Sequence, residues 1–78
     1  MHLEIVTPDK KLFSGEAEIV SIPGIDGSLG ILNNHAPLIT TLRKGSIKIT
    51  DKDKKVTEFP VNGGVVEVLK NQVIILAD

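Results

Sequence analysis

Short apolar segments alternate with turn signals along the whole of this 78-residue chain. Residues 46–50, Ser-Ile-Lys-Ile-Thr, alternate cleanly, so that Ile47 and Ile49 share one face of an extended strand. β-branched residues, which favour strands, are frequent, and no segment has a helical period of useful length. We count roughly eight to ten short strands at the spacing typical of a β-sandwich or β-barrel, and therefore expect an all-β fold.

Turn residues and apolar runs locate several of these strands. Within residues 11–22, Gly15 is expected to mark either a bulge or a bend between two strands, and the cluster Pro-Gly-Ile-Asp-Gly at 23–27 is expected to form a turn. Residues 73–76 are apolar at every position, which predicts a central strand covered on both faces. We expect one domain over residues 1–78 with a small stability margin, because so short a chain buries only about 60% of its unfolded surface.

The composition argues against several classes of function. A net charge of -1 and only two aromatic residues, Phe13 and Phe59, disfavour nucleic-acid binding. Because cysteine is absent, neither a disulfide nor a thiolate metal site is expected. No apolar run is long enough to span a membrane, and residues 1–4 do not resemble a signal peptide, so the expected compartment is the cytoplasm or an organelle matrix.

No motif in the chain predicts catalysis, a metal ion or a cofactor. The histidines are His2 and His35, and neither belongs to a catalytic motif. His35 can be interpreted as a catalytic base, a turn histidine or an interface residue, and we favour the interface. The acidic residues are scattered rather than clustered, and Gly24, Gly27 and Gly30 have no following helix that would hold a phosphate.

A carrier domain and a small enzyme are the alternative functions. Lipoyl and biotinyl domains are β-rich, of similar size and modified on a lysine at a hairpin tip, where this chain has Lys52 and Lys54. The neighbours of these lysines, Asp51, Asp53 and Lys55, do not match the flanking residues of those families. A small hydrolase or isomerase would need His35 as its base, and no partner motif supports that role.

Three sequence segments, taken in order, match a family pattern. They are Phe-Ser-Gly-Glu at 13–16, Asp-Gly-Ser-Leu-Gly-Ile at 26–31 with His-Ala-Pro-Leu at 35–38 and Thr40, and Gly-Gly-Val-Val-Glu-Val at 63–68 with the run at 73–78. Their order and spacing, over essentially the whole chain, resemble the epsilon subunit of F-type ATP synthases. The resemblance implies a flattened all-β sandwich or barrel of two five-stranded sheets, with about ten short strands.

This resemblance implies a non-catalytic rotor subunit of the central stalk, which docks onto the gamma subunit and the c ring and couples proton transport to ATP synthesis. The family's c-ring contact corresponds here to Asp26, Gly27, Ser28 and Leu29. Many relatives carry an acidic residue at the position of Ser28, so Asp26 is the residue left to supply that charge. The positions that face gamma in the family correspond to Thr7, His35 and Thr40, and we expect His35, Pro37 and Leu38 to form a semi-apolar anchor for gamma.

Typical members of the family continue into a C-terminal two-helix hairpin, which residues 1–78 do not contain. The resemblance therefore implies neither an inhibitory helix nor an ATP site in this chain. It also implies a peripheral location at the cytoplasmic face of the bacterial inner membrane, reached through the complex, and a monomer when the chain is isolated.

Overall fold

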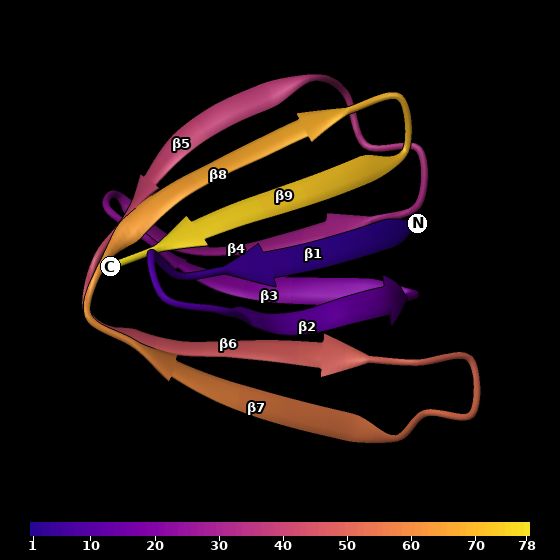
Figure 1. Ribbon diagram of the computed structural model, residues 1–78. Helices are drawn as coiled ribbons and strands as arrows, with labels where there is room; N and C mark the ends of the chain where they lie inside the picture. Colours follow the sequence, from indigo (N-terminus) through magenta and orange to yellow (C-terminus); the bar gives the residue numbers. More distant parts are fainter.

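The computed structural model describes residues 1–78 as nine β-strands and no helix (Figure 1), which confirms the expected all-β fold. No helix is present with the length and apolar character that a membrane crossing requires. In chain order the strands are β1 (His2–Val6), β2 (Lys11–Glu16), β3 (Ile19–Gly24), β4 (Gly27–Leu32), β5 (Leu38–Leu42), β6 (Gly45–Thr50), β7 (Val56–Val61), β8 (Gly64–Leu69) and β9 (Gln72–Ala77).

The strands form one continuous sheet that curls on itself, in the order β2-β1-β9-β8-β5-β3-β6-β7, with β4 paired to β3. One layer holds the five strands β2, β1, β9, β8 and β5, and the other holds the four strands β4, β3, β6 and β7. The layers join where Gly24 pairs with Leu42. The expected sandwich is therefore present, with five and four strands in place of two sets of five. Every pairing is antiparallel except that of β1 with β9.

The core is built only from apolar side chains that alternate along the strands. No polar or charged residue is buried. Leu3, Ile5 and Ile75 face inward from the five-stranded layer and meet Ile31 and Ile47 of the other layer within one hydrophobic cluster. Since protein interiors pack as densely as organic crystals, an apolar core of this kind makes the domain stiff.

Strand β9 corrects one expectation from the sequence. It lies in the middle of its layer between β1 and β8, as expected, but only one of its faces is covered. Ile74 and Leu76 are 38% and 55% exposed, because they point to the outer face of the five-stranded layer and no second layer covers that face. The prediction of a strand covered on both faces was wrong.

Two turns also differ from their expected positions. Gly15 lies within β2, and the break before β3 falls at Ala17 and Glu18. In the 23–27 cluster only Ile25 and Asp26 form the turn, because the residues before and after them belong to β3 and β4. The hairpin of β3 and β4 is thus tighter than the sequence suggested.

The two aromatic residues contact each other, and they lie on the two strands at opposite ends of the sheet order. Strands β2 and β7 each pair on one side only, and Phe13 of β2 contacts Phe59 of β7 with ring centroids 5.9 Å apart and ring planes at 67°. Edge-to-face pairs of this kind add stability beyond the area that they bury. The Phe13–Phe59 contact therefore links two strands that share no ladder of backbone hydrogen bonds.

Replacing Phe59 with alanine is expected to lower the free energy of unfolding by about 2 kcal/mol, less than the 3–5 of a fully buried Phe, because this ring is only partly buried. Urea unfolding followed by circular dichroism measures the change. A double-mutant cycle with Phe13→Ala should give a coupling energy of about 0.5–1.5 kcal/mol. Additive effects of the two substitutions would contradict a stabilising role for the aromatic contact.

Candidate docking surfaces

The first candidate surface is the tip of the β3–β4 hairpin, which carries the predicted c-ring contact. Gly27 has a φ of +131°, and a Cβ on Gly24 would lie 2.7 Å from the carbonyl oxygen of Gly27, so both positions require glycine. Ile25 is 58% exposed at the tip, beside an exposed Asp26. The result is a narrow projection that presents one apolar side chain and one carboxylate.

The remaining predicted c-ring residues lie just behind the tip on β4. Ser28 is exposed, whereas Leu29 is partly buried and packs against the core. Leu29 therefore holds the hairpin in place, and only Asp26, Gly27 and Ser28 of the predicted set are open to a partner. Ile25 was missed by the sequence reasoning, although an apolar residue inside a turn cluster is an unusual signal.

The second candidate surface begins with the loop that carries His35. Asn34 adopts a left-handed φ of 60°, and its backbone N–H donates to the side-chain oxygen of Asn71 at 2.7 Å. The N–H of His35 donates to the carbonyl oxygen of Leu32 at 3.2 Å. Nδ1 of His35 lies 2.7 Å from the carbonyl oxygen of Ala36, so it carries the proton and donates. His35 is thus fixed by backbone contacts.

A shallow groove of about 360 Å³ follows this loop, and it is lined by Pro37, Leu38, Ile39, Glu67, Val68 and Leu69. Leu38 and Thr40 pair with the buried residues Val68 and Val66, so their side chains are on the core-facing side of β5. Ile39 lies between them on the opposite side and is 73% exposed. The structure therefore brings Pro37 and Leu38 together, and it adds Ile39, which the sequence reasoning did not select.

Thr7 lies apart from the other residues predicted to face gamma. It forms a turn in which its N–H donates to the carbonyl oxygen of Lys10 at 2.8 Å. It lines a second groove of about 410 Å³ together with Gly64 and Val65, at the start of β8. The groove next to His35 is at the other end of the same strand, where Leu69 lies. Any single partner that contacts both must therefore extend along β8.

Between the two grooves lies an exposed apolar surface on β5, β8 and β9, which we call the outer face. Its position follows from the register, because Val65 is opposite Leu76, and Glu67 pairs with both Ile39 and Ile74. Residues directly opposite one another on neighbouring strands point to the same face of a sheet. The outer face consists of Ile39, Val65, Leu69, Ile74 and Leu76, with Glu67 among them.

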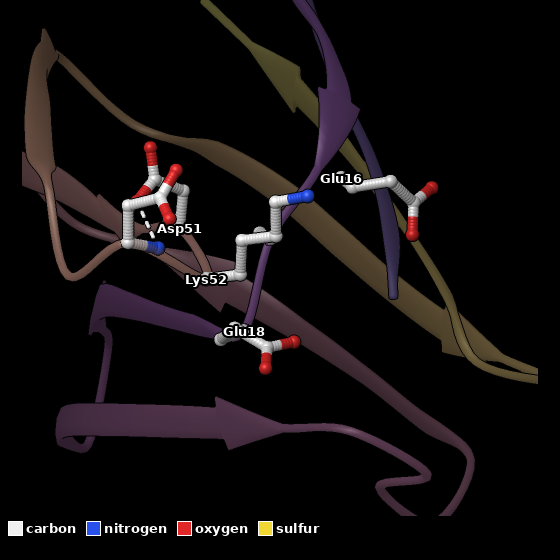
Figure 2. A pocket seen from close by; sticks show the side chains of 6 residues that line it. Glu16, Glu18, Asp51 and Lys52 are labelled. Atoms are coloured by element: carbon white, nitrogen blue, oxygen red, sulfur yellow. Dashed lines mark hydrogen bonds between the residues drawn. The ribbon is translucent and has the colours of Figure 1, made fainter.

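Carboxylates gather at another part of the surface, where the loop at 17–18 approaches the hairpin turn at 51–53. Figure 2 shows that the side chains of Glu16 and Glu18 point away from Asp51, so the carboxylates do not converge. Asp51 accepts hydrogen bonds from the N–H groups of Asp53 and Lys55, both at 2.9 Å. No group of three His, Cys, Asp or Glu side chains is placed to hold a metal ion. Of these acidic residues, Asp51 shapes the hairpin turn.

A small ionic cluster lies on the surface of β1 and β2. Nε2 of His2 is 3.2 Å from Glu4, and the ammonium group of Lys11 is 3.6 Å from the same carboxylate. The hydrogen bond from His2, followed by the charge of Lys11, holds the pKa of Glu4 below its usual range. Because exposed ion pairs of this kind contribute little stability, the cluster adds little to the stability of the fold.

Comparison with known proteins places the chain in a family. Residues 1–78 match the family described as ATP synthase, Delta/Epsilon chain, beta-sandwich domain. The chain is 44% identical to the ATP synthase epsilon chain of Caulobacter vibrioides, and the match covers 100% of this chain and 90% of that relative. It is 46% identical to the epsilon chain of Herminiimonas arsenicoxydans, of which it spans 56%. The chain thus spans nearly all of one relative and about half of another.

Solved structures agree with the fold. A chain of the Euglena gracilis mitochondrial ATP synthase superposes with a TM-score of 0.90 at 21% identity, over 96% of this chain and 48% of that chain. A chain from the central stalk and c ring of the Tetrahymena thermophila mitochondrial ATP synthase superposes with a TM-score of 0.82 at 26% identity. The match covers 99% of this chain and 62% of that chain. A lipoyl or biotinyl carrier is not favoured by these matches. The chain belongs to the beta-sandwich family of ATP synthase delta and epsilon chains.

Proposed function

We propose that this chain is a non-catalytic subunit of the central stalk of a bacterial F-type ATP synthase, where it couples proton transport to ATP synthesis. The observation that carries the proposal is the match over the whole chain to a bacterial epsilon chain of which it covers 90%. The superposition on a chain from a central stalk and c-ring assembly supports the same role. In this role the chain is held peripherally at the cytoplasmic face of the bacterial inner membrane.

The two candidate surfaces suit two different partners. The hairpin tip, with Asp26 and Ile25, would reach the polar loops of the c ring, where a carboxylate can pair with a basic residue. The groove beside His35 and the outer face would bind gamma, because an apolar centre with a polar rim is the usual composition of a protein interface. The apolar core between these surfaces is stiff, and a stiff body can transmit torque from one partner to the other.

Ile39 is the residue that best tests the gamma surface. Ile39→Glu is expected to weaken binding of the isolated gamma subunit at least tenfold, which corresponds to about 1.4 kcal/mol, because it places a charge in the apolar centre of the interface. Isothermal titration calorimetry measures the affinity. Since Ile39 is 73% exposed, thermal unfolding should change little, whereas a charge at the partly buried Leu38 would also disturb the core.

Val56→Glu is the matched control, because Val56 is 55% exposed on β7 in the other layer, away from the outer face. It should bind gamma with unchanged affinity. Equal losses from both substitutions would mean that added negative charge, and not the position, weakens binding. Unchanged binding by Ile39→Glu would exclude the proposed gamma surface.

A further inference from the structure

Three strands of the sheet pair with a neighbour on one side only: β2, β7 and β4. An unpaired edge is a template for pairing with another chain, and proteins usually protect it with charge, proline or a bulge. Strand β2 carries Lys11 and Glu16, and its pairing with β1 has a register shift. Strand β7 carries Glu58 and Pro60. Both strands are therefore protected in the usual ways.

Strand β4 has none of these protections. Its sequence, Gly-Ser-Leu-Gly-Ile-Leu, contains neither a charged residue nor a proline. Its six residues pair with β3 in one uninterrupted register from Ile19–Leu32 to Gly24–Gly27, without a bulge. An open, uncharged and regular edge is a liability in an isolated domain, and it is explained if a partner covers it in the assembly.

The direction of the free backbone groups on β4 follows from Pro23. Pro23 has no N–H, and its carbonyl oxygen accepts from the N–H of Arg43, which lies on the side of β3 away from β4. In the antiparallel ladder of β3 and β4, Pro23 and Ser28 therefore form a pair whose two backbones exchange no hydrogen bonds. Because such pairs alternate along an antiparallel ladder, Ser28, Gly30 and Leu32 direct their backbone groups away from β3. Leu29 and Ile31 direct theirs toward it.

The approach to this edge is open. Ser28, Gly30 and Leu32 are all exposed. A Cβ added to Gly30 would have no heavy atom within 4 Å, so nothing packs on that face of the strand at its middle. Among the outward-directed groups, only the carbonyl oxygen of Leu32 has a recorded partner, the N–H of His35. The N–H and C=O groups of Ser28 and Gly30 are left for a further strand.

We infer that β4 accepts a strand from an extended segment of the gamma subunit, which forms backbone hydrogen bonds with Ser28, Gly30 and Leu32. This inference rests on the proposed function, and it names how the partner is held. Strand β4 runs into the loop of His35, and the carbonyl oxygen of Leu32 at its end accepts from the N–H of His35, so the edge continues into the surface proposed for gamma. Continuity with that surface favours gamma as the occupant.

The edge also defines the chemistry of the added segment. A charged side chain would be unfavourable beside the exposed apolar Leu32, so the segment should be uncharged in its centre. Gly30 presents no side chain, which leaves space for a large or aromatic residue opposite it. Main-chain bonds would provide affinity and these alternate side chains would provide specificity, as in other cases of strand addition.

Hydrogen exchange by NMR tests this inference on the unmodified protein. In the free chain the amides of Ser28, Gly30 and Leu32 should exchange rapidly, whereas those of Leu29 and Ile31, bonded to β3, should be protected. Adding the gamma subunit of the same synthase should slow exchange at Gly30 and Ser28 by about a hundredfold or more. The alternation along one strand is the internal control, because burial by side chains alone would not produce it.

A pair of substitutions at Gly30 gives a second test. Gly30→Pro removes an N–H that bonds to nothing in the free chain, and proline is tolerated on an edge where its nitrogen faces outward. It should weaken gamma binding about tenfold or more, because a partner carbonyl loses its donor. Gly30→Ala keeps the N–H and adds only one methyl group, so it should lose much less affinity than Gly30→Pro. Thermal unfolding of both variants shows that they fold.

The outcomes separate this inference from the proposed function. If gamma binds but Gly30 stays unprotected and Gly30→Pro binds normally, the strand addition is wrong and the stalk role stands. If gamma does not bind at all, both are overturned. If the free chain forms a dimer in ultracentrifugation that Gly30→Pro abolishes and gamma does not disrupt, the edge belongs to a second copy, which also overturns the inference.

Discussion

Replacing Gly64 with alanine is expected to remove about 4 kcal/mol or more from the free energy of unfolding, which places it among the most damaging single substitutions. Gly64 has a φ of +145°, and a Cβ there would lie 2.2 Å from the carbonyl oxygen of Leu76. The contact is with backbone of the paired strand β9, so relief requires the two strands to separate. At about 0.05–0.15 kcal/mol per residue, the whole stability of a 78-residue domain is about 4–12 kcal/mol, so this loss is a large part of it.

Gly63 provides a matched control for this prediction. It has the same φ of +145°, but its Cβ would meet mainly the side-chain oxygen of Asp78, at 2.9 Å, which can rotate away. Gly63→Ala should therefore cost only the backbone strain of about 1–3 kcal/mol. The chain has no tryptophan or tyrosine, so unfolding in urea is best followed by far-ultraviolet circular dichroism. Equal losses at the two positions would show that φ alone, and not the carbonyl contact, is decisive.

Ile75→Ala is expected to have the second-largest effect, a loss of about 3–4 kcal/mol. The Ile75 side chain is fully buried, on a strand that pairs with β1 on one side and β8 on the other. Truncation removes apolar contacts and leaves a cavity that the flanking strands hold open, and buried Ile→Ala changes typically cost 2–5 kcal/mol. Thermal unfolding should show a clear fall in Tm, because a small domain shifts by about 4–8 °C for each kcal/mol.

Ile74→Ala is the natural comparison, since it makes the same change one residue earlier on the same strand. Ile74 lies on the outer face and is 38% exposed, so its truncation should cost less than about 1 kcal/mol. Because both variants make the same change on the same strand, the difference between their free energies of unfolding measures the effect of burial and not of strand propensity. If Ile74→Ala were as destabilising as Ile75→Ala, the outer face would be packed against something in the isolated protein.

Local patterns were sufficient to predict most strands of this protein. The alternation around Ile47 and Ile49 identified β6, and both side chains are buried in the core. Asn33 and Asn34 form a turn, in which Asn34 has the left-handed φ that asparagine tolerates. These features depend on residues close in sequence, and for that reason a single chain is sufficient to predict them.

Features that depend on distant strands could not be predicted in the same way. Apolar residues at every position of 73–76 predicted two covered faces, but whether a second layer lies over Ile74 and Leu76 depends on the whole topology. The corner at Gly24 and Leu42, where one layer passes into the other, has no local signal either. Strand periodicity defines two faces, and it does not identify what each face meets.

The candidate docking residues were partly predictable for the same reason. Asp26 to Ser28 and His35 to Leu38 occupy two short stretches, so each set remains together in the structure. Thr7 is distant in sequence and lies at the other end of β8. The sequence reasoning missed Ile39 because it selected Leu38 and Thr40, the neighbours that point to the core. The free edge of β4 became visible only with the pairing of all nine strands.

The parallel pairing of β1 with β9 determines when this protein can be completed during its synthesis. β1 is the first of the nine strands to be made, whereas its partner β9 is the last of them. Until then β1 can pair only with β2, and its apolar inner face stays open to chaperones. Closing so long a loop costs entropy before any contact compensates for it, so folding is slow and follows translation. The closed sandwich therefore becomes available to a partner only after β9 has been made.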